Sequence, residues 1–285
     1  MKSIWGKLLV IVLASVFVFA GVTIALTKLE YTETDQTYDT AADRFIGTVS
    51  PVPKASTATP VVSEPVQTAQ NVETPAPTET PRELVLAPFE VDFEALTTLN
   101  GDVVGWIYCE DTPINYPVVH GSDNVYYLGH TYDHKQNRAG AIFVEANNRP
   151  GFVDANTIIY GHHMVEGDAM FSTLEKWKEQ DYYEAHPSFY LLTPERDYRV
   201  DLLAGYLISA YSDTYQIIYN HGRDLEDYLD RTLPLSDFRA EYTLDPEANY
   251  VLLSTCAFRG EVEKPRYVLH GILVPLDSAG GKPLE

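Results

Sequence analysis

An uncharged apolar run near the N-terminus constrains this chain more than any other feature. Residues 8–26 contain no Asp, Glu, Lys or Arg, and a helix of these 19 residues is about long enough to cross a bilayer. Lys2 and Lys7 precede the run, and a short basic start favours a cytoplasmic N-terminus. Residues 1–29 are therefore predicted to form a short cytoplasmic start and a membrane anchor, with the rest of the chain outside the cell.

A cleaved signal peptide is the alternative interpretation of the same run. Ala20 and Gly21 are small residues that could mark a cleavage site. The apolar core of a cleaved signal usually has about 7–15 residues, so the longer run favours a retained anchor. Under either interpretation the remaining chain lies outside the cytoplasm.

The composition changes after the apolar run. Residues 30–88 are rich in Thr, Ser, Ala, Val and Glu, and prolines interrupt them at positions 51, 53, 60, 65, 75, 77 and 81. A segment of this kind shows no sustained helical or strand period and stays extended. It is predicted to be a disordered extracellular stalk that carries the following domain.

Residues 89–285 are predicted to form one folded domain with a short C-terminal tail. Short apolar runs separated by turn residues predict strands at residues 103–108, 114–119, 141–144, 157–160, 188–192, 198–208, 250–253 and 267–274. Helical spacing of apolar residues predicts helices at residues 89–100, 171–178 and 223–233. Many short strands with few helices indicate a mostly β fold, a closed or nearly closed barrel with peripheral helices.

Charge and cysteine content exclude several functions. The net charge of −21 argues against nucleic-acid binding, which needs clustered Lys and Arg. The two cysteines, Cys109 and Cys256, are too few for a disulfide framework. No Cys/His cluster has zinc-binding spacing, so no structural metal is predicted. Cys109 is expected to be a structural strand residue with a free thiol.

Two residues at predicted strand ends could carry proton-transfer and nucleophilic chemistry. Cys256 ends a strand at the barrel rim, although a lone cysteine is often a buried structural residue. His162 follows a strand and Gly161, a residue small enough for a tight turn toward a cleft. Imidazole titrates in the range that a cysteine nucleophile requires of its partner. A surface turn with two histidines is the alternative.

Arg266 opens the last predicted strand, ten residues after Cys256. A guanidinium there could stabilise an oxyanion or hold a substrate backbone through paired N–H donors. An ordinary arginine at a strand end is the alternative role. Arg259, three residues after Cys256, is the rival for the same function.

Three separated motifs resemble those of a known enzyme family. Residues 252–256 read Leu-Leu-Ser-Thr-Cys and resemble the Thr-Leu-X-Thr-Cys signature of the sortases, in which an arginine follows on the next strand. Residues 157–164 resemble the segment with the catalytic histidine of that family. Residues 104–107 and 112–119 resemble the class B branch in particular. The resemblance extends over nearly the whole predicted domain.

This sequence departs from the family pattern at two positions. Leu252 stands where the signature has Thr, four residues before the thiol, so the change is expected to affect packing rather than chemistry. Cys109 stands where relatives more often have another residue.

The resemblance implies an eight-stranded barrel with helices at its N-terminus and between two late strands. It also implies that Cys256 attacks a Thr carbonyl in a sorting signal near the C-terminus of another secreted protein. His162 then protonates the leaving amine, and Arg266 stabilises the oxyanion. An amine, typically of a peptidoglycan precursor, resolves the thioacyl-enzyme, and no cofactor is needed.

Three other functions remain open at this stage. A related sortase could polymerise pilin subunits through Lys side chains. A cysteine peptidase or peptidoglycan hydrolase could use the same residues and pass the acyl group to water. An anchored adhesin or binding module would need none of this chemistry, and in it Cys256, His162 and Arg266 would not converge.

Overall fold

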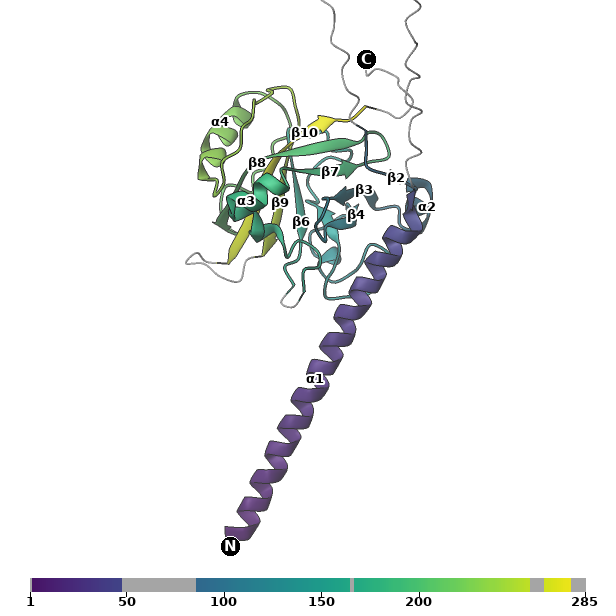
Figure 1. Cartoon of the computed structure of the whole chain (residues 1–285), viewed down its shortest axis with the longest axis vertical. Coiled ribbons are helices and arrows are strands. Elements are labelled where there is room, and N and C mark those ends of the chain that lie inside the picture. Colours follow the sequence, from purple (N-terminus) through teal and green to yellow (C-terminus); the bar gives the residue numbers. More distant parts are fainter. Residues whose placement is uncertain (1, 48–85, 165–166, 257–263, 278–285) are drawn as a thin grey trace, which may run out of the picture.

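The structure is a computed structural model that describes residues 2–47, 86–164, 167–256 and 264–277. It consists of a β-barrel and a long N-terminal helix that packs against one side of the barrel (Figure 1). Most of the predicted stalk, residues 48–85, lies outside the described residues, as does the tail from residue 278.

Eight strands form a closed barrel, as the sequence predicted. Their order around the barrel is β10-β8-β7-β3-β4-β5-β6-β9. The strands are β3 (Val103–Tyr108), β4 (Asn115–Val119), β5 (Ile142–Val144), β6 (Asn156–Gly161), β7 (Ser188–Leu192), β8 (Tyr198–Ser209), β9 (Tyr250–Cys256) and β10 (Pro265–Pro275). Neighbours are antiparallel except for the pairs β4–β5 and β6–β9, which are parallel. A closed barrel of this kind leaves no strand edge free for pairing with other chains.

Short helices and one small sheet surround the barrel. They are α2 (Phe93–Leu99), α3 (Gln180–Ala185), α4 (Arg223–Thr232), the 3-10 segments η1 (Tyr126–Leu128), η2 (Leu174–Lys178) and η3 (Leu233–Leu235), and the paired strands β1 (Ile46–Gly47) and β2 (Glu90–Val91). The predicted helix at residues 223–233 is α4. The helix predicted at residues 171–178 is the 3-10 segment η2, and α3, which follows it, was not predicted.

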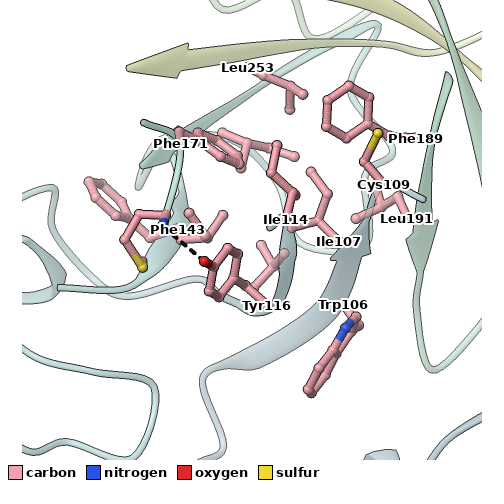
Figure 2. Packing of buried hydrophobic residues seen from close by; sticks show 14 of the residues in the cluster. Trp106, Ile107, Cys109, Ile114, Tyr116, Phe143, Phe171, Phe189, Leu191 and Leu253 are labelled. Atoms are coloured by element: carbon pink, nitrogen blue, oxygen red, sulfur yellow. Dashed lines mark hydrogen bonds between the residues drawn. The ribbon is translucent and has the colours of Figure 1, made fainter. Parts of the chain in front are cut away.

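The barrel interior is filled by side chains from every wall. Ile107, Ile114, Phe189 and Leu253 point toward one another in Figure 2, and all four are buried. Cys109 lies among them with its Sγ 3.5 Å from the carbonyl oxygen of Ser188. Burial raises the pKa of this thiol to about 12. The prediction of a free, buried thiol at Cys109 is confirmed, but the residue directly follows β3 and is not part of a strand.

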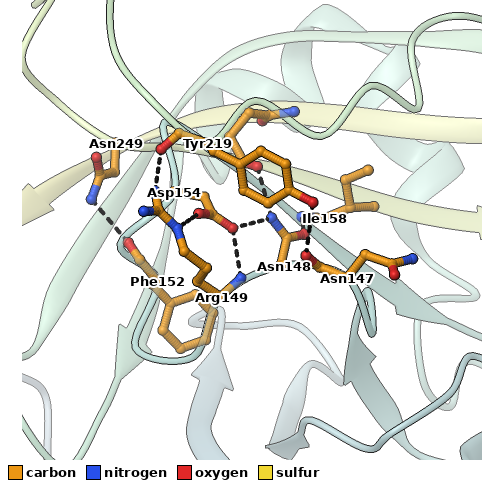
Figure 3. A network of polar contacts seen from close by, with 9 residues as sticks. Asn147, Asn148, Arg149, Phe152, Asp154, Ile158, Tyr219 and Asn249 are labelled. Atoms are coloured by element: carbon orange, nitrogen blue, oxygen red, sulfur yellow. Dashed lines mark hydrogen bonds and ion pairs between the residues drawn. The ribbon is translucent and has the colours of Figure 1, made fainter.

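A buried carboxylate organises the connection between β5 and β6. Asp154 accepts hydrogen bonds from the amide of Asn148 at 2.7 Å and from the backbone N–H of Arg149 at 2.8 Å (Figure 3). The guanidinium of Arg149 also pairs with Asp154 and donates to the carbonyl oxygen of Tyr219. A buried charge is stabilised when it is paired and fully hydrogen-bonded. The network fixes the end of the barrel at which β6 begins.

Helix α1 (Lys2–Phe45) is longer than the sequence analysis predicted. The predicted stalk began at residue 30, but residues 30–45 continue the helix and residues 46–47 form β1, so that part of the prediction is wrong. The reason is tertiary packing. Thr34, Tyr38, Ala41 and Phe45 are buried along one helical face, and two of them are too small or polar to have marked a helix by composition.

Specific contacts hold this part of α1 on the barrel. The Tyr38 hydroxyl donates to the carbonyl oxygen of Gly140 at 2.5 Å, and its ring packs edge-on against Tyr116 with 5.1 Å between centroids. The Thr34 hydroxyl donates to Asn137 Oδ1 at 3.0 Å. Helix α1 therefore runs without interruption from its apolar N-terminal part into the packing against the barrel.

The docked tyrosine provides a test of this packing. Tyr38→Ala should lower the free energy of unfolding of the full chain in detergent by about 3 kcal/mol, as expected when a buried aromatic side chain is removed. Gln36→Ala, at an exposed position on the same helix, should leave it nearly unchanged. Chemical denaturation followed by tyrosine and tryptophan fluorescence measures both. Equal free energies of unfolding for the two variants would contradict the docking of α1.

Candidate active site

Three neighbouring strands bring the predicted site residues to one end of the barrel. Gly161 of β6 is in register with Thr255 of β9, and Cys256 of β9 is in register with Arg266 of β10. Adjacent strands lie about 4.8 Å apart. His162, which directly follows β6, and Arg266 therefore flank the backbone of Cys256 from opposite sides.

A cleft of about 310 Å³ opens at this end of the barrel. His162 and Arg266 both line it, together with Asn124, Leu128, Phe143, Tyr160, Gly161, Ala210, Tyr215, Ser254 and Thr255. The side chain of Cys256 and the whole of Arg259 lie outside the described residues. The structure thus brings His162 and Arg266 to one cleft, at the end of the strand that carries Cys256.

A hydrogen bond to the backbone orients the imidazole of His162. Its Nε2 lies 2.8 Å from the carbonyl oxygen of Leu128. A carbonyl oxygen only accepts, so Nε2 carries a proton and the acceptor of the neutral ring is Nδ1. The next residue, His163, instead forms an isolated β-bridge with Met170.

The guanidinium of Arg266 lies beside Tyr160 on the cleft wall. Burial and the carboxylate of Glu145 raise the pKa of Tyr160, and the positive charge of Arg266 opposes that shift. Nη1 of Arg266 donates to the carbonyl oxygen of Pro265 at 3.0 Å. A guanidinium has five N–H donors, and this bond uses one of them. The other donors of the planar group can bind a further acceptor.

Gly161 is needed for packing and not for a turn. It is the last residue of β6, and the described glycines with positive φ are Gly140, Gly151, Gly167 and Gly222. A Cβ at position 161 would lie 2.5 Å from Ile142 Cδ1 and 2.6 Å from the ring of Phe171. The expected tight turn at Gly161 is therefore wrong. Its missing side chain lets the strand that precedes His162 lie close against the core.

The sequence motifs did not reveal the polar wall of the cleft or the buried carboxylate behind it. Glu145 is only 6% exposed and accepts hydrogen bonds from Asn124 Nδ2 at 2.6 Å and from the Tyr160 hydroxyl at 3.0 Å. Beside Tyr160, whose ring centroid is 6.3 Å from that of Tyr215, the Tyr215 and Ser254 hydroxyls are 2.8 Å apart. Strand alternation could have identified part of this wall, because Ser254 lies two residues before the thiol and Tyr160 two before the histidine.

Comparison with known proteins identifies the architecture. The family model described as the Sortase domain matches residues 107–274, more than half of the chain. The chain belongs to the sortase family. Its sequence is 38% identical to sortase B of Listeria monocytogenes over 181 residues, which cover 63% of this chain and 72% of the relative. It is 30% identical to sortase B of Staphylococcus aureus over 164 residues, 58% and 67% of the two chains.

Solved structures show the same barrel. A crystal structure of Staphylococcus aureus sortase B superimposes with a TM-score of 0.60 at 28% identity, covering 65% of this chain and 87% of that one. Clostridium perfringens sortase B gives a TM-score of 0.60 at 26% identity, covering 64% and 100%. The sortase described here is a cysteine transpeptidase of class B. That identification excludes the adhesin alternative.

The close packing at Gly161 generates a prediction. Gly161→Ala should cost about 1–3 kcal/mol in stability, as overpacking does, and should lower activity because the added methyl displaces the strand that positions His162. Gly129→Ala is the matched control, since a Cβ there would meet no atom within 4 Å although the residue adjoins Leu128. Thermal unfolding and a peptide-cleavage assay test both variants. Normal activity of Gly161→Ala would contradict the packing role.

Proposed function

We propose that this sortase uses Cys256, His162 and Arg266 to cleave a C-terminal sorting signal in secreted surface proteins and to transfer the acyl group to an amine of a peptidoglycan precursor. The strand register supports the proposal, because Cys256 on β9 has β6, directly followed by the acid–base group His162, on one side and the cationic donor Arg266 of β10 on the other. Nucleophile, proton donor and oxyanion donor are the three roles that acyl transfer requires.

The first half of the reaction forms a thioester. The Cys256 thiolate attacks the Thr carbonyl carbon of the signal, and the carbonyl oxygen becomes an oxyanion beside the Arg266 guanidinium. The C–N bond then breaks, and the leaving amine takes a proton from the imidazolium of His162. Because Nε2 of His162 already donates to the carbonyl oxygen of Leu128, the proton that moves is the one on Nδ1.

The second half reverses these roles. An incoming amine attacks the thioester carbon, gives its proton to Nδ1 of His162, and the Cys256 thiolate leaves. One solved sortase B structure is a complex with triglycine, and a structure of the Staphylococcus aureus enzyme is a complex with substrate. These complexes support a peptide amine as the acceptor class of this chain.

The apolar part of α1 supports attachment of the enzyme to a membrane. The most apolar window of this helix has a mean hydropathy of 2.1, and none of it is buried against the described part of the chain. Lys2 and Lys7 favour a cytoplasmic N-terminus. The proposed arrangement is a single-pass membrane enzyme whose barrel lies outside the cell.

Mass spectrometry of the full chain with candidate sorting peptides and amine acceptors tests this function. We expect an acyl adduct on the peptide that contains Cys256 and a product in which the added amine replaces the leaving group. Cys256→Ala should give neither product while keeping the unfolding temperature of the parent. Release of the free acid alone, even at high amine concentration, would favour the peptidase or hydrolase alternative. A product joined through a Lys side chain would favour pilin polymerisation.

Arg266→Lys tests the oxyanion role. Lysine keeps the charge but lacks the planar fork, so kcat should fall by about 10²–10³-fold, the usual effect of losing an oxyanion donor. KM should change less, because the oxyanion charge develops in the transition state. Arg259→Lys is the control and should be nearly silent. Loss of activity in Arg259→Lys with a silent Arg266→Lys would assign the role to Arg259.

A further inference from the structure

Helix α1 fixes the height of the barrel above its anchoring bilayer. The apolar side chains of α1 are exposed as far as Leu26 and Leu29. The next residue, Glu30, already contacts the barrel, with Oε2 3.6 Å from Nη1 of Arg138. A helix rises 1.5 Å per residue, so Glu30, the partner of Arg138, lies about 6 Å beyond Leu26 along the helix axis. If the apolar run is in the bilayer, Arg138 is at the level of the lipid headgroups.

The chain around Arg138 has the composition of a membrane-interface segment. We call residues 120–141, which connect β4 to β5, the rim segment. Val125 is 72% exposed, and Tyr126 and Leu128 are exposed beside it. The side chains of Lys135 and Arg138 are 67% and 69% exposed, and each has one carboxylate partner, Asp133 for Lys135 and Glu30 for Arg138. Aromatic, apolar and cationic side chains together are favoured at headgroup level. The rim segment has two Lys or Arg against two Asp or Glu, whereas the whole chain has 20 against 41, so this segment is less acidic than the rest.

The rim segment lies at the same end of the barrel as the cleft. Leu128 lines the cleft and accepts the hydrogen bond from His162. In Figure 1 the end of β9 and the lower side of the barrel are directed toward the N-terminal half of α1. The buried contacts of Thr34, Tyr38 and Phe45 prevent the barrel from swinging away from the helix without unpacking.

We propose that the rim segment rests on the lipid headgroups of the bilayer that holds α1, so that the catalytic cleft opens at the membrane surface. The proposal rests on the membrane anchoring proposed above. Under this arrangement the cleft meets chains as they emerge from the bilayer, and the distal end of the barrel, with its Asp154 network, points into the surrounding medium.

Fluorescence quenching by headgroup-labelled lipid tests the contact. The full chain, with Cys109→Ser and Cys256→Ala, would carry a fluorophore on Val125→Cys in vesicles of phosphatidylcholine and phosphatidylglycerol that contain a lipid with a nitroxide headgroup. Val153→Cys is the matched control, because Val153 is also exposed (51%) but precedes β6 at the other end of the barrel. We expect several-fold stronger quenching at position 125.

The possible results distinguish the headgroup contact from the membrane anchoring on which it rests. Equal quenching at positions 125 and 153, in a chain that co-sediments with the vesicles, would overturn the headgroup contact alone. A purified chain that begins near Gly21 and stays in solution would overturn the anchoring and the contact together.

A charge reversal tests the chemistry of the contact. Lys135→Glu should weaken quenching of the label at position 125 in anionic vesicles, and the loss should be smaller in pure phosphatidylcholine. Arg223→Glu is the control, since Arg223 is exposed on α4, which Figure 1 shows far from the N-terminal half of α1. Equal effects of the two reversals would overturn an electrostatic contribution from the rim segment.

Discussion

The position of β9 between β6 and β10 is the constraint on which the rest of this structure depends. Its pairing closes the barrel, and it aligns three strand ends at one rim. The β6–β9 pair is parallel, so both strands end on the same side. A parallel pair needs a long crossover, and here residues 162–249 supply it with β7, β8 and α4. Val251, Leu252 and Leu253 are buried, which gives the proposed nucleophile a rigid support.

The strands were predictable because each one contains a short run of buried apolar residues that can be recognised in the sequence by itself. The runs at residues 103–108 and 188–192 coincide with β3 and β7, and most other strands differ by one or two residues at an end. The prediction for β9 stopped at Leu253, three residues early, because Ser254 and Thr255 are polar although both are buried. The length of helix α1 was underestimated for a related reason. Its docked face uses Thr34 and Ala41, which gain their apolar surroundings only from the barrel.

The candidate site was predictable only where the chemistry lies in a motif. His162 and Arg266 were identified from their segments, and the structure brings both to one cleft. Glu145 could not have been found in this way. Its donor Asn147 is only two residues away, but Asn124 and Tyr160 reach it only in the folded barrel, in which β5 pairs with β6. A buried carboxylate of this kind appears in the sequence as one acidic residue among many.

The environment of Cys109 makes the chain chemically simpler than its two cysteines suggest. Burial raises the pKa of this thiol to about 12, well above neutral pH, and the core covers it. A thiol-directed electrophile therefore has one cysteine left to react with in the folded enzyme, the proposed nucleophile. The number of alkyl groups bound per chain would then give the fraction of enzyme molecules with a reactive Cys256. The natural substrate need not be known for this measurement.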